Sequence, residues 1–509
     1  MKTYAIAVLG TFDLQNYGDL LFPLLTRREL AERLGSVEVL PFSYHRREEP
    51  DWPYRVLPVE EFPDRLAEID GVVVGGGHVV RFDREVAPGY GPGSPEIHHP
   101  TGLWLFPAFV AATYGLPVVW NGIGASPEVG SWAPGLFAAT LESSRYVSVR
   151  DRAAQATLRA MAPVTECAVV PDSGFGVRAL LEEGDVEEGF RRWRRAHGLE
   201  GPYVVVQAAE RLEPVAADLR RELATLAERG IAAVELPIGP VLGDSTGWIA
   251  PDSTAVVRVE SWPSPLLLAR IIGGAEAAVG PSLHLGITAL CHGVPVHRPR
   301  SWPGQKYESL AEFPGVFQFD EIGREPRLVL AGRTGRGEIS SEVARHRELL
   351  ARHWDRIAAA LEASPGATDT RALSSSRLPR ELIRCLNALA RGEDAREESA
   401  VELRRQAELW NEAERGRERL EAELVEARRS LEERRATATE LRAWLEDLRR
   451  STGEERGRLE GELEALNAVR RSRTWRLAAT LGRIYAVAAT PWRWARSLIS
   501  RSRRDSPGT

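Results

Sequence analysis

The 509-residue sequence has few cysteines, and none of them are spaced to share a metal ion. Cys167, Cys291 and Cys385 lie far apart and form no C-x-x-C motif, so we expect neither a zinc ribbon nor a disulfide framework. The sequence also lacks an H-E-x-x-H motif, a P-loop and any other metal-spaced cluster. We therefore expect no tightly bound metal or cofactor, and the cysteine usage fits a reducing cytoplasm.

Long hydrophobic runs are missing too. No run of about 18 or more uncharged apolar residues occurs, so no membrane-spanning helix is expected. The first ten residues, MKTYAIAVLG, hold one lysine and a short apolar run, which is typical of a β-strand and not of a secretory signal. The net charge is only −6, so the charge of the whole chain indicates no nucleic-acid partner.

The chain is too long for one hydrophobic core, and its composition changes along its length. Alternating strands and helices fill the first part, and a Ser-, Pro- and Gly-rich segment then leads into a Glu-, Arg- and Leu-rich one. We divide the chain into a first Rossmann-like domain (1–180), a second one (181–362), a linker with a short helix (363–398), a coiled coil (399–467) and a basic aromatic tail (468–509).

In the first domain, five predicted strands each end in a loop of glycine, polar or charged residues. These loops are Asn16-Tyr17-Gly18-Asp19, Gly75-Gly76-Gly77-His78, Asn121-Gly122-Ile123-Gly124-Ala125-Ser126, Arg150-Asp151 and Pro171-Asp172-Ser173-Gly174-Phe175. The carboxyl ends of parallel strands face a common crevice, where open α/β sheets bind ligands. Each loop also has an ordinary interpretation as a helix cap, an ion pair or a turn, but coincidence explains five of them poorly.

The second domain restarts the alternation at the strand 203–207, and its most informative stretch is Ala278 to Val296. This stretch predicts a buried strand, a Gly280-Pro281 turn, a helix and a further strand. His284 falls in the first turn of that helix, where backbone N–H groups and the helix dipole favour an anion. His284 is therefore a candidate catalytic or phosphate-contacting residue, and the alternative is a capped, solvated histidine.

The ordered motifs N-x-G-D, the triple glycine after V-V-V, G-I-G-A-S, S-V-R-D and P-D-S-G-F resemble the polysaccharide pyruvyl transferase family. The run G-P-S-L-H-L-G-I-T-A-L-C-H-G-V-P-V is similar to the second-domain signature of that family. The resemblance implies an α/β fold of two Rossmann-like doubly wound domains facing a cleft, in a GT-B-like arrangement. It also implies transfer of a pyruvyl group from phosphoenolpyruvate, the donor substrate, to a sugar of a cell-surface glycan or its lipid-linked precursor.

If the resemblance holds, His284 acts as general acid on the enolpyruvyl methylene or contacts the phosphate. Asp19 or Asp172 orients or deprotonates a sugar hydroxyl, and Arg150 and Lys306 neutralise the charges of the donor. The remaining substrate-binding candidates are Asn16, Gly76, Gly77, His78, Asn121, Gly124 and Ser282.

Ser282 departs from the family pattern, because family members usually carry an arginine two residues before this histidine. A donor with a phosphate and a carboxylate favours guanidinium contacts. Arg298, Arg300 or Lys306 could supply the missing contact. The departure leaves two alternatives open: a GT-B-like glycosyltransferase that uses a nucleotide sugar, with Glu260 as a ribose-contacting candidate, and a catalytically decayed scaffold in surface-glycan assembly.

Beyond the two domains, leucines recur at heptad spacing and predict a coiled coil. Examples are Leu424, Leu431 and Leu445 on one heptad position, with Leu441 and Leu448 on its partner. We expect a homodimer through this segment. Residues 468–504 contain ten arginines, no acidic residue and three tryptophans, which favours an anionic membrane surface over nucleic acid. The expected location is the cytoplasm, peripheral to the inner face of the plasma membrane.

Overall fold

The computed structural model describes residues 2–82, 97–126, 134–163, 165–182, 185–247, 249, 256–299, 310, 312–319, 328–332 and 336–362, with isolated positions beyond. The chain forms two compact units, residues 1–389 and 390–509. The predicted coiled coil and basic tail, and most of the predicted linker, lie outside the described residues and stay predictions. Within the described part, no helix combines the length and the apolar composition that crossing a bilayer requires.

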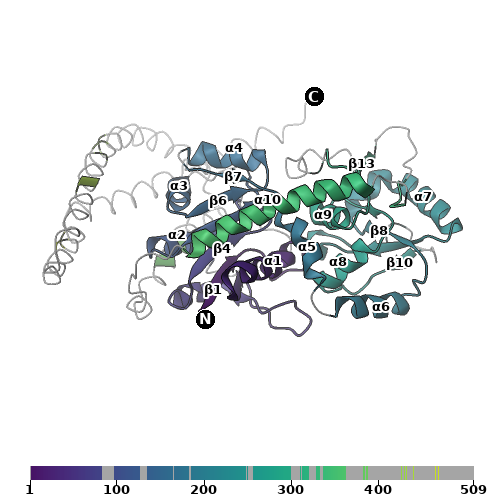
Figure 1. Cartoon of the computed structure of the whole chain (residues 1–509), viewed down its shortest axis with the longest axis horizontal. Coiled ribbons are helices and arrows are strands. Elements are labelled where there is room, and N and C mark those ends of the chain that lie inside the picture. Colours follow the sequence, from purple (N-terminus) through teal and green to yellow (C-terminus); the bar gives the residue numbers. More distant parts are fainter. Residues whose placement is uncertain are drawn as a thin grey trace, which may run out of the picture. The chain divides into compact units, whose positions relative to one another are not determined.

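The first sheet has seven strands in the order β3-β2-β1-β4-β5-β6-β7, and the neighbouring strands are parallel (Figure 1). The order reverses direction between β1 and β4, which makes this pair the switch point at which open α/β sheets bind ligands. The strands are β1 (Thr3–Leu9), β2 (Ser36–Ser43), β3 (Leu57–Pro58), β4 (Gly71–Gly75), β5 (Val118–Ile123), β6 (Tyr146–Val149) and β7 (Ala168–Val169).

Two of these strands, β2 and β3, are missing from the sequence prediction. Glu38 and Pro41 interrupt the apolar run of β2, and β3 has only two residues. A proline has no N–H to donate, so it is tolerated where a strand has no neighbour on that side. Only Phe42 and Ser43 of β2 pair with β3, so Pro41 lies beyond the stretch that pairs on that side.

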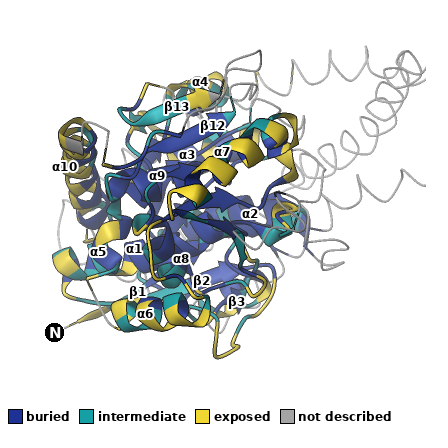
Figure 2. Cartoon of the chain, turned by 90° about the vertical axis from the view of Figure 1, so that its right-hand side faces the viewer, coloured by how far each residue is buried: buried dark blue, intermediate teal, exposed yellow. Residues whose placement is uncertain are grey.

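Helices cover both faces of the sheet, and its central strands are accordingly mostly apolar. The strand β4, with the sequence GVVVG, is fully buried. The helical elements of the first domain are α1 (Tyr17–Leu34), η1 (Val59–Arg65), α2 (Thr101–Thr113), α3 (Pro134–Glu142), α4 (Arg152–Met161), η2 (Ser173–Gly176) and α5 (Val177–Leu180). Figure 2 shows the strands in dark blue beneath helices whose outer faces are exposed.

The second sheet has six parallel strands in the order β10-β9-β8-β11-β12-β13. They are β8 (Tyr203–Gln207), β9 (Ala232–Leu236), β10 (Val256–Arg258), β11 (Ala278–Val279), β12 (Val296–Pro299) and β13 (Val316–Phe319). The helical elements are α6 (Val186–Ala196), η3 (Glu210–Val215), α7 (Ala216–Glu228), η4 (Pro240–Leu242), α8 (Pro265–Gly273) and α9 (Leu283–Cys291). The chain therefore contains two parallel-sheet α/β domains.

The start of α1 joins the two domains. The backbone N–H of Tyr17 donates to the carbonyl of Ile238 at 3.0 Å, and the Tyr17 hydroxyl lies 2.7 Å from the Thr288 hydroxyl of α9. Trp52 of the first domain also stacks on Trp262 of the second, with ring centroids 6.4 Å apart. These contacts hold the carboxyl ends of the two sheets next to each other.

The long helix α10 (Arg336–Glu362) contacts β5 and β6 of the first domain and α9 of the second, and Figure 1 shows it crossing between them. His353 anchors it to the first domain. The Nε2–H of His353 donates to Asn121 Oδ1 at 2.8 Å, and the Tyr146 hydroxyl donates to Nδ1 at 3.0 Å. This arrangement uses both ring nitrogens of a neutral imidazole.

We expect the stability of the protein to fall as the pH drops below about 6.5, the ordinary pKa of histidine. Burial, together with the nearby Arg356 and Arg33, lowers the pKa of His353 to about 3. Because the folded state disfavours the charged imidazole, this contribution to stability is complete above the unfolded pKa and is lost as the pH falls toward 3. Burial lowers the pKa of His292 and His297 to about 4, with the same sign.

The measurement is the free energy of unfolding in urea between pH 5 and 8 as a function of pH. His353→Phe should be less stable at pH 8 and should show a slope reduced by up to about 1.4 kcal/mol per pH unit below pH 6. His197→Gln, at a partly exposed histidine, is the matched control. An unchanged slope in His353→Phe would contradict the assignment.

Candidate functional site

A cavity of 340 Å³ lies where the carboxyl ends of the two sheets meet. Its volume is at the lower end of the range for ligand pockets, which is roughly 300–1,000 Å³. From the first domain it is lined by Thr11, Leu14, Asn16, Asp19, Tyr44, Gly77, His78, Val79, Arg81, His99, Pro100, Leu103, Trp104 and Arg150. From the second domain it is lined by Gln207, Ala209, Glu210, Arg211, Ile238, Gly239, Val241, Leu242, Gly243, Asp244, Pro281, Ser282, Leu283 and His284.

His284 enters the cavity from the first turn of α9 and is 8% exposed. Its ring contacts Phe22 edge-on at a centroid distance of 5.5 Å. A Cβ atom on Gly18 would lie 1.9 Å from His284 Nδ1, so the ring needs the glycine. The imidazole of one domain is thus seated against α1 of the other.

Arg150 follows β6, and its side chain is 1% exposed. Its nearest carboxylate oxygens are Asp151 Oδ2 at 3.4 Å and Asp172 Oδ2 at 3.9 Å, and none of its three side-chain nitrogens has a hydrogen-bond partner among the described residues. Burying polar N–H groups without partners is costly. A carboxylate or phosphate could satisfy this guanidinium through two parallel hydrogen bonds.

Asp172 lies between Arg150 and His284. Its Oδ1 is 3.6 Å from His284 Nε2, and it also accepts a hydrogen bond from the Gly174 N–H at 2.8 Å. Burial raises the pKa of Asp172, but the neighbouring His284 and Arg150 outweigh burial and hold this pKa below its usual range. Asp172 does not line the cavity, so the structure places it behind His284 and not where a sugar hydroxyl would lie.

Asp19 does line the cavity. Its Oδ2 accepts hydrogen bonds from the Thr11 hydroxyl and from Asn16 Nδ2, both at 2.7 Å. Asn16 occupies the N-cap position of α1, but its side chain makes no capping bond and binds Asp19. The Asn16 side chain therefore does not cap α1. It donates a hydrogen bond to the Asp19 carboxylate, which lines the cavity.

The loop after β4 needs its glycines. Gly76 and Gly77 have φ of +86° and +75°, values that side-chain-bearing residues rarely adopt. A Cβ at Gly76 would lie 2.0 Å from Phe22, and one at Gly77 would lie 2.7 Å from Asp19 Oδ1. Gly77 and His78 line the cavity, whereas Gly76 packs behind it.

Gly124 also lies behind the wall of the cavity. A Cβ there would lie 2.7 Å from Arg150 Nη2 and 2.8 Å from His78 Nδ1. Because Gly124 has no side chain, Arg150 and His78 can both pack against it, and these two residues do line the cavity.

On the second domain, the sequence analysis missed a buried pair, Gln207 and Asp244. Gln207 Oε1 accepts from the Ser282 N–H at 2.9 Å, and its Nε2 donates to Asp244 Oδ2 at 2.9 Å. Asp244 Oδ2 also accepts from the N–H groups of Ile238 and Gly239, and burial raises the pKa of Asp244. The available signal was their position: Gln207 ends β8, and Asp244 lies eight residues after the end of β9.

A family model described as polysaccharide pyruvyl transferase matches residues 16–298, which is more than half of the chain. The chain belongs to the polysaccharide pyruvyl transferase family. The matched range contains the cavity from Asn16 to His284. No curated protein sequence matches the chain.

Solved structures that resemble the chain include nucleotide-sugar enzymes. UDP-GlcNAc 2-epimerase from Methanocaldococcus jannaschii has a TM-score of 0.41 and 11% identity, covering 68% of this chain and 100% of that one. UDP-GlcNAc 2-epimerase from Neisseria meningitidis, bound to UDP-GlcNAc, has a TM-score of 0.41 and 12% identity, and the match covers 70% of this chain and 94% of that one. A glycosyltransferase from Rickettsia africae has a TM-score of 0.38 and 10% identity, and the match covers 78% of this chain and 100% of that one. Scores this low support no argument about function.

Besides Asp172, Gly76 and Gly124, three further residues considered for the site of this pyruvyl transferase family member do not line the cavity. Asn121 accepts from His353 of α10 and from the Ser173 hydroxyl, so it joins α10 to the first domain. Arg298 is buried and donates to the Pro281 carbonyl at 3.3 Å, which supports the turn before α9. Glu260 is exposed. Lys306 and Arg300 lie outside the described residues.

Ser282, where family members usually carry an arginine, is the N-cap of α9. Its hydroxyl accepts from the Leu285 N–H at 3.4 Å, and its own N–H is bound by Gln207. It also lines the cavity beside His284. At this position the chain therefore has a capped helix N-terminus in place of the guanidinium that the family resemblance implies.

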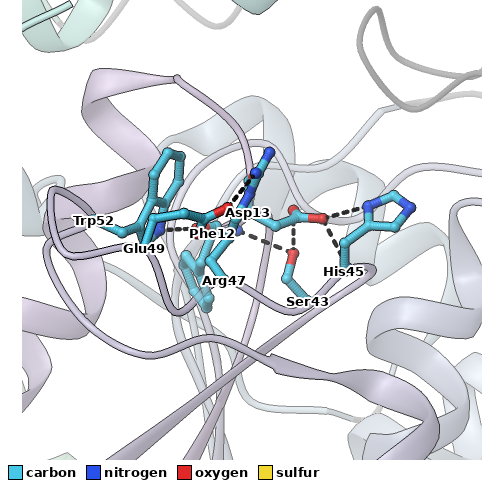
Figure 3. Close-up of polar contacts among 7 residues, drawn as sticks. All are labelled: Phe12, Asp13, Ser43, His45, Arg47, Glu49 and Trp52. Carbon is cyan, nitrogen blue, oxygen red and sulfur yellow. Dashed lines mark hydrogen bonds and ion pairs between the residues drawn. The ribbon is translucent and has the colours of Figure 1, made fainter.

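The loop between β1 and α1, which carries Thr11 and Asn16, is held by a buried carboxylate that the sequence analysis did not identify (Figure 3). Asp13 is fully buried and accepts from the Ser43 hydroxyl at 2.5 Å, the His45 N–H at 2.9 Å and His45 Nδ1 at 2.8 Å. The Arg47 side chain donates to the Asp13 carbonyl at 2.8 Å.

No group of three or more metal-ligating side chains occurs among the described residues.

We expect Gly18→Ala to destabilise the protein by about 1–3 kcal/mol, because the added methyl group would overlap the His284 ring. In an open helical site the same change stabilises by roughly 0.5–1 kcal/mol. Gly135 of α3 is such a site, with nothing within 4 Å of an added Cβ, so Gly135→Ala is the matched control.

Urea denaturation measures both variants. Gly18→Ala combined with His284→Ala should recover much of the lost stability, since the two changes act on one contact. Strict additivity of the two changes would show that the ring and the glycine are independent.

Proposed function

We propose that this family member transfers the pyruvyl group of phosphoenolpyruvate to a sugar of a cell-surface glycan or its lipid-linked precursor, forming a pyruvate ketal. The observation that most supports the proposal is the buried Arg150 guanidinium, which has no hydrogen-bond partner among the described residues. Arg150 and His284 both line the cavity, so a negatively charged ligand there could accept hydrogen bonds from the unsatisfied guanidinium. Phosphoenolpyruvate carries two anionic groups.

The reaction needs one acid and one base, and the cavity offers both. His284 donates its proton to the methylene carbon of the donor while a sugar hydroxyl adds to the neighbouring carbon and Asp19 takes the hydroxyl proton. A second hydroxyl of the same sugar then closes the ketal, and its proton leaves with inorganic phosphate. His284 regains a proton from Asp19 through solvent, so the enzyme ends unchanged.

The donor's two anionic groups need separate contacts. Arg150 provides a planar guanidinium for one of them. The N-terminus of α9, capped by Ser282, lies beside His284 and favours negative charge at the other. Gly77 allows the backbone to approach the ligand closely, and His78 borders the same space. Lys306 stays a candidate for a further contact.

Among the alternatives, a nucleotide-sugar glycosyltransferase calls for an acidic ribose-contacting residue on the second domain. Glu260 is exposed and does not line the cavity, whereas Glu210 and Asp244 do. A decayed scaffold is disfavoured by the intact chain of contacts from Arg150 through Asp172 to His284. We keep the sequence-based expectation of a homodimer through residues 399–467. We also keep the expectation of peripheral attachment, through residues 468–509, to the cytoplasmic face of the plasma membrane.

Ligand-dependent unfolding of the full chain tests the donor. At about a hundred times its dissociation constant, phosphoenolpyruvate should raise the free energy of unfolding by roughly 2.7 kcal/mol. Arg150→Met should abolish this stabilisation, and His284→Gln should weaken it. Arg152→Met, at an exposed arginine two residues along, is the matched control and should retain it.

Two outcomes of this measurement would contradict the proposal. The first is stabilisation by phosphoenolpyruvate that persists in Arg150→Met. The second is stabilisation by nucleotide sugars alone, which would favour the glycosyltransferase.

A further inference from the structure

One end of the cavity is aromatic. Tyr44, directly after β2, and His99, Leu103 and Trp104, at the start of α2, all line it. The opposite end, on the second domain, is formed by charged and amide side chains together with the loop 238–244. The two ends therefore differ in chemistry, although they flank the same pair, Arg150 and His284.

The aromatic end is rigid. Tyr44 is 5% exposed, its hydroxyl donates to the Pro100 carbonyl at 3.2 Å, and its ring lies 5.2 Å from that of His99. Its two chain neighbours, Ser43 and His45, are both hydrogen-bonded to the buried Asp13 (Figure 3). The Tyr44 ring is thus fixed before any ligand arrives.

Trp104 is held as firmly. Its ring makes edge contacts with Phe82, Phe137 and Trp120 at centroid distances of 5.4, 5.5 and 6.0 Å. Its indole N–H is buried and has no hydrogen-bond partner among the described residues. A buried indole N–H usually finds a partner, and a ligand hydroxyl in this part of the cavity would provide one.

Aromatic faces and hydroxyl partners are what a sugar ring needs, because one face of a pyranose presents C–H groups and its edge presents hydroxyls. We infer that Tyr44, His99 and Trp104 form the subsite for the terminal pyranose ring of the acceptor. Asp19 lines the same cavity and is the acceptor that we propose for a hydroxyl of that ring. This inference rests on the proposed function and names the part of the acceptor that the enzyme recognises.

The volume of the cavity limits what enters. At 340 Å³ it has room for the three-carbon donor and about one sugar ring. The rest of the glycan, or the lipid-linked portion, then lies outside. A simple methyl glycoside should therefore bind as the terminal sugar does.

Saturation-transfer NMR on the full chain, without phosphoenolpyruvate, tests this directly. The probes are the methyl glycosides of glucose, galactose, mannose and their 2-acetamido forms. At least one should receive saturation from the protein. Tyr44→Leu and His99→Ala should each weaken its binding by about fivefold or more, the effect of losing an aromatic contact. Tyr44→Phe and His99→Phe, which keep the rings, should bind nearly as wild type.

Trp104→Phe keeps an aromatic ring but removes the five-membered ring of the indole together with its N–H, so it should weaken binding by about threefold to tenfold. Thermal unfolding of each variant verifies that it is folded. Arg150→Met should lose stabilisation by phosphoenolpyruvate yet still bind the glycoside, so failure of the donor proposal and failure of the acceptor subsite give different results.

The inference is overturned if no glycoside binds the wild-type protein, because one ring then does not suffice. It is also overturned if folded Tyr44→Leu and His99→Ala bind as wild type. Weakening by Arg211→Gln with no effect of the aromatic variants would place the acceptor on the second domain instead.

Discussion

The buried carboxylate of Asp172 connects the parts of this molecule that matter for function. It follows β7 of the first domain, and it lies 3.9 Å from Arg150 Nη1 and 3.6 Å from His284 Nε2 of the second domain. Buried charges are tolerated when they compensate one another. Arg150 and Asp172 belong to the first domain and His284 to the second, so the three residues come together only while the two domains are packed against each other.

The N-terminus of α1 makes that packing possible. Tyr17 bonds to Ile238 and Thr288 of the second domain, and Gly18 provides the space for the His284 ring. One residue further, Asp19 faces the cavity. Three consecutive residues thus join the domains, seat the proposed acid and present the proposed base.

The sequence predicted the parts of the fold that depend on local pattern. Apolar strands followed by glycine or polar loops indicated where β1 and β4 end, and the loops after these two strands do meet at one cavity. It could not show which loop residues face a ligand. Asn121 was expected to bind substrate, but its partner His353 lies on α10, 232 residues later in the chain. The bond from Gln207 to Ser282 joins residues 75 positions apart, and no local pattern reveals such a pair.

The central claim is that Arg150 and His284 bind one anionic donor between the two sheets. The most direct measurement is a crystal structure of the protein with phosphoenolpyruvate. We expect a carboxylate or phosphate bonded to the Arg150 guanidinium, with the methylene carbon of the donor next to the His284 ring. A donor bound elsewhere, with Arg150 still lacking a hydrogen-bond partner, would contradict it.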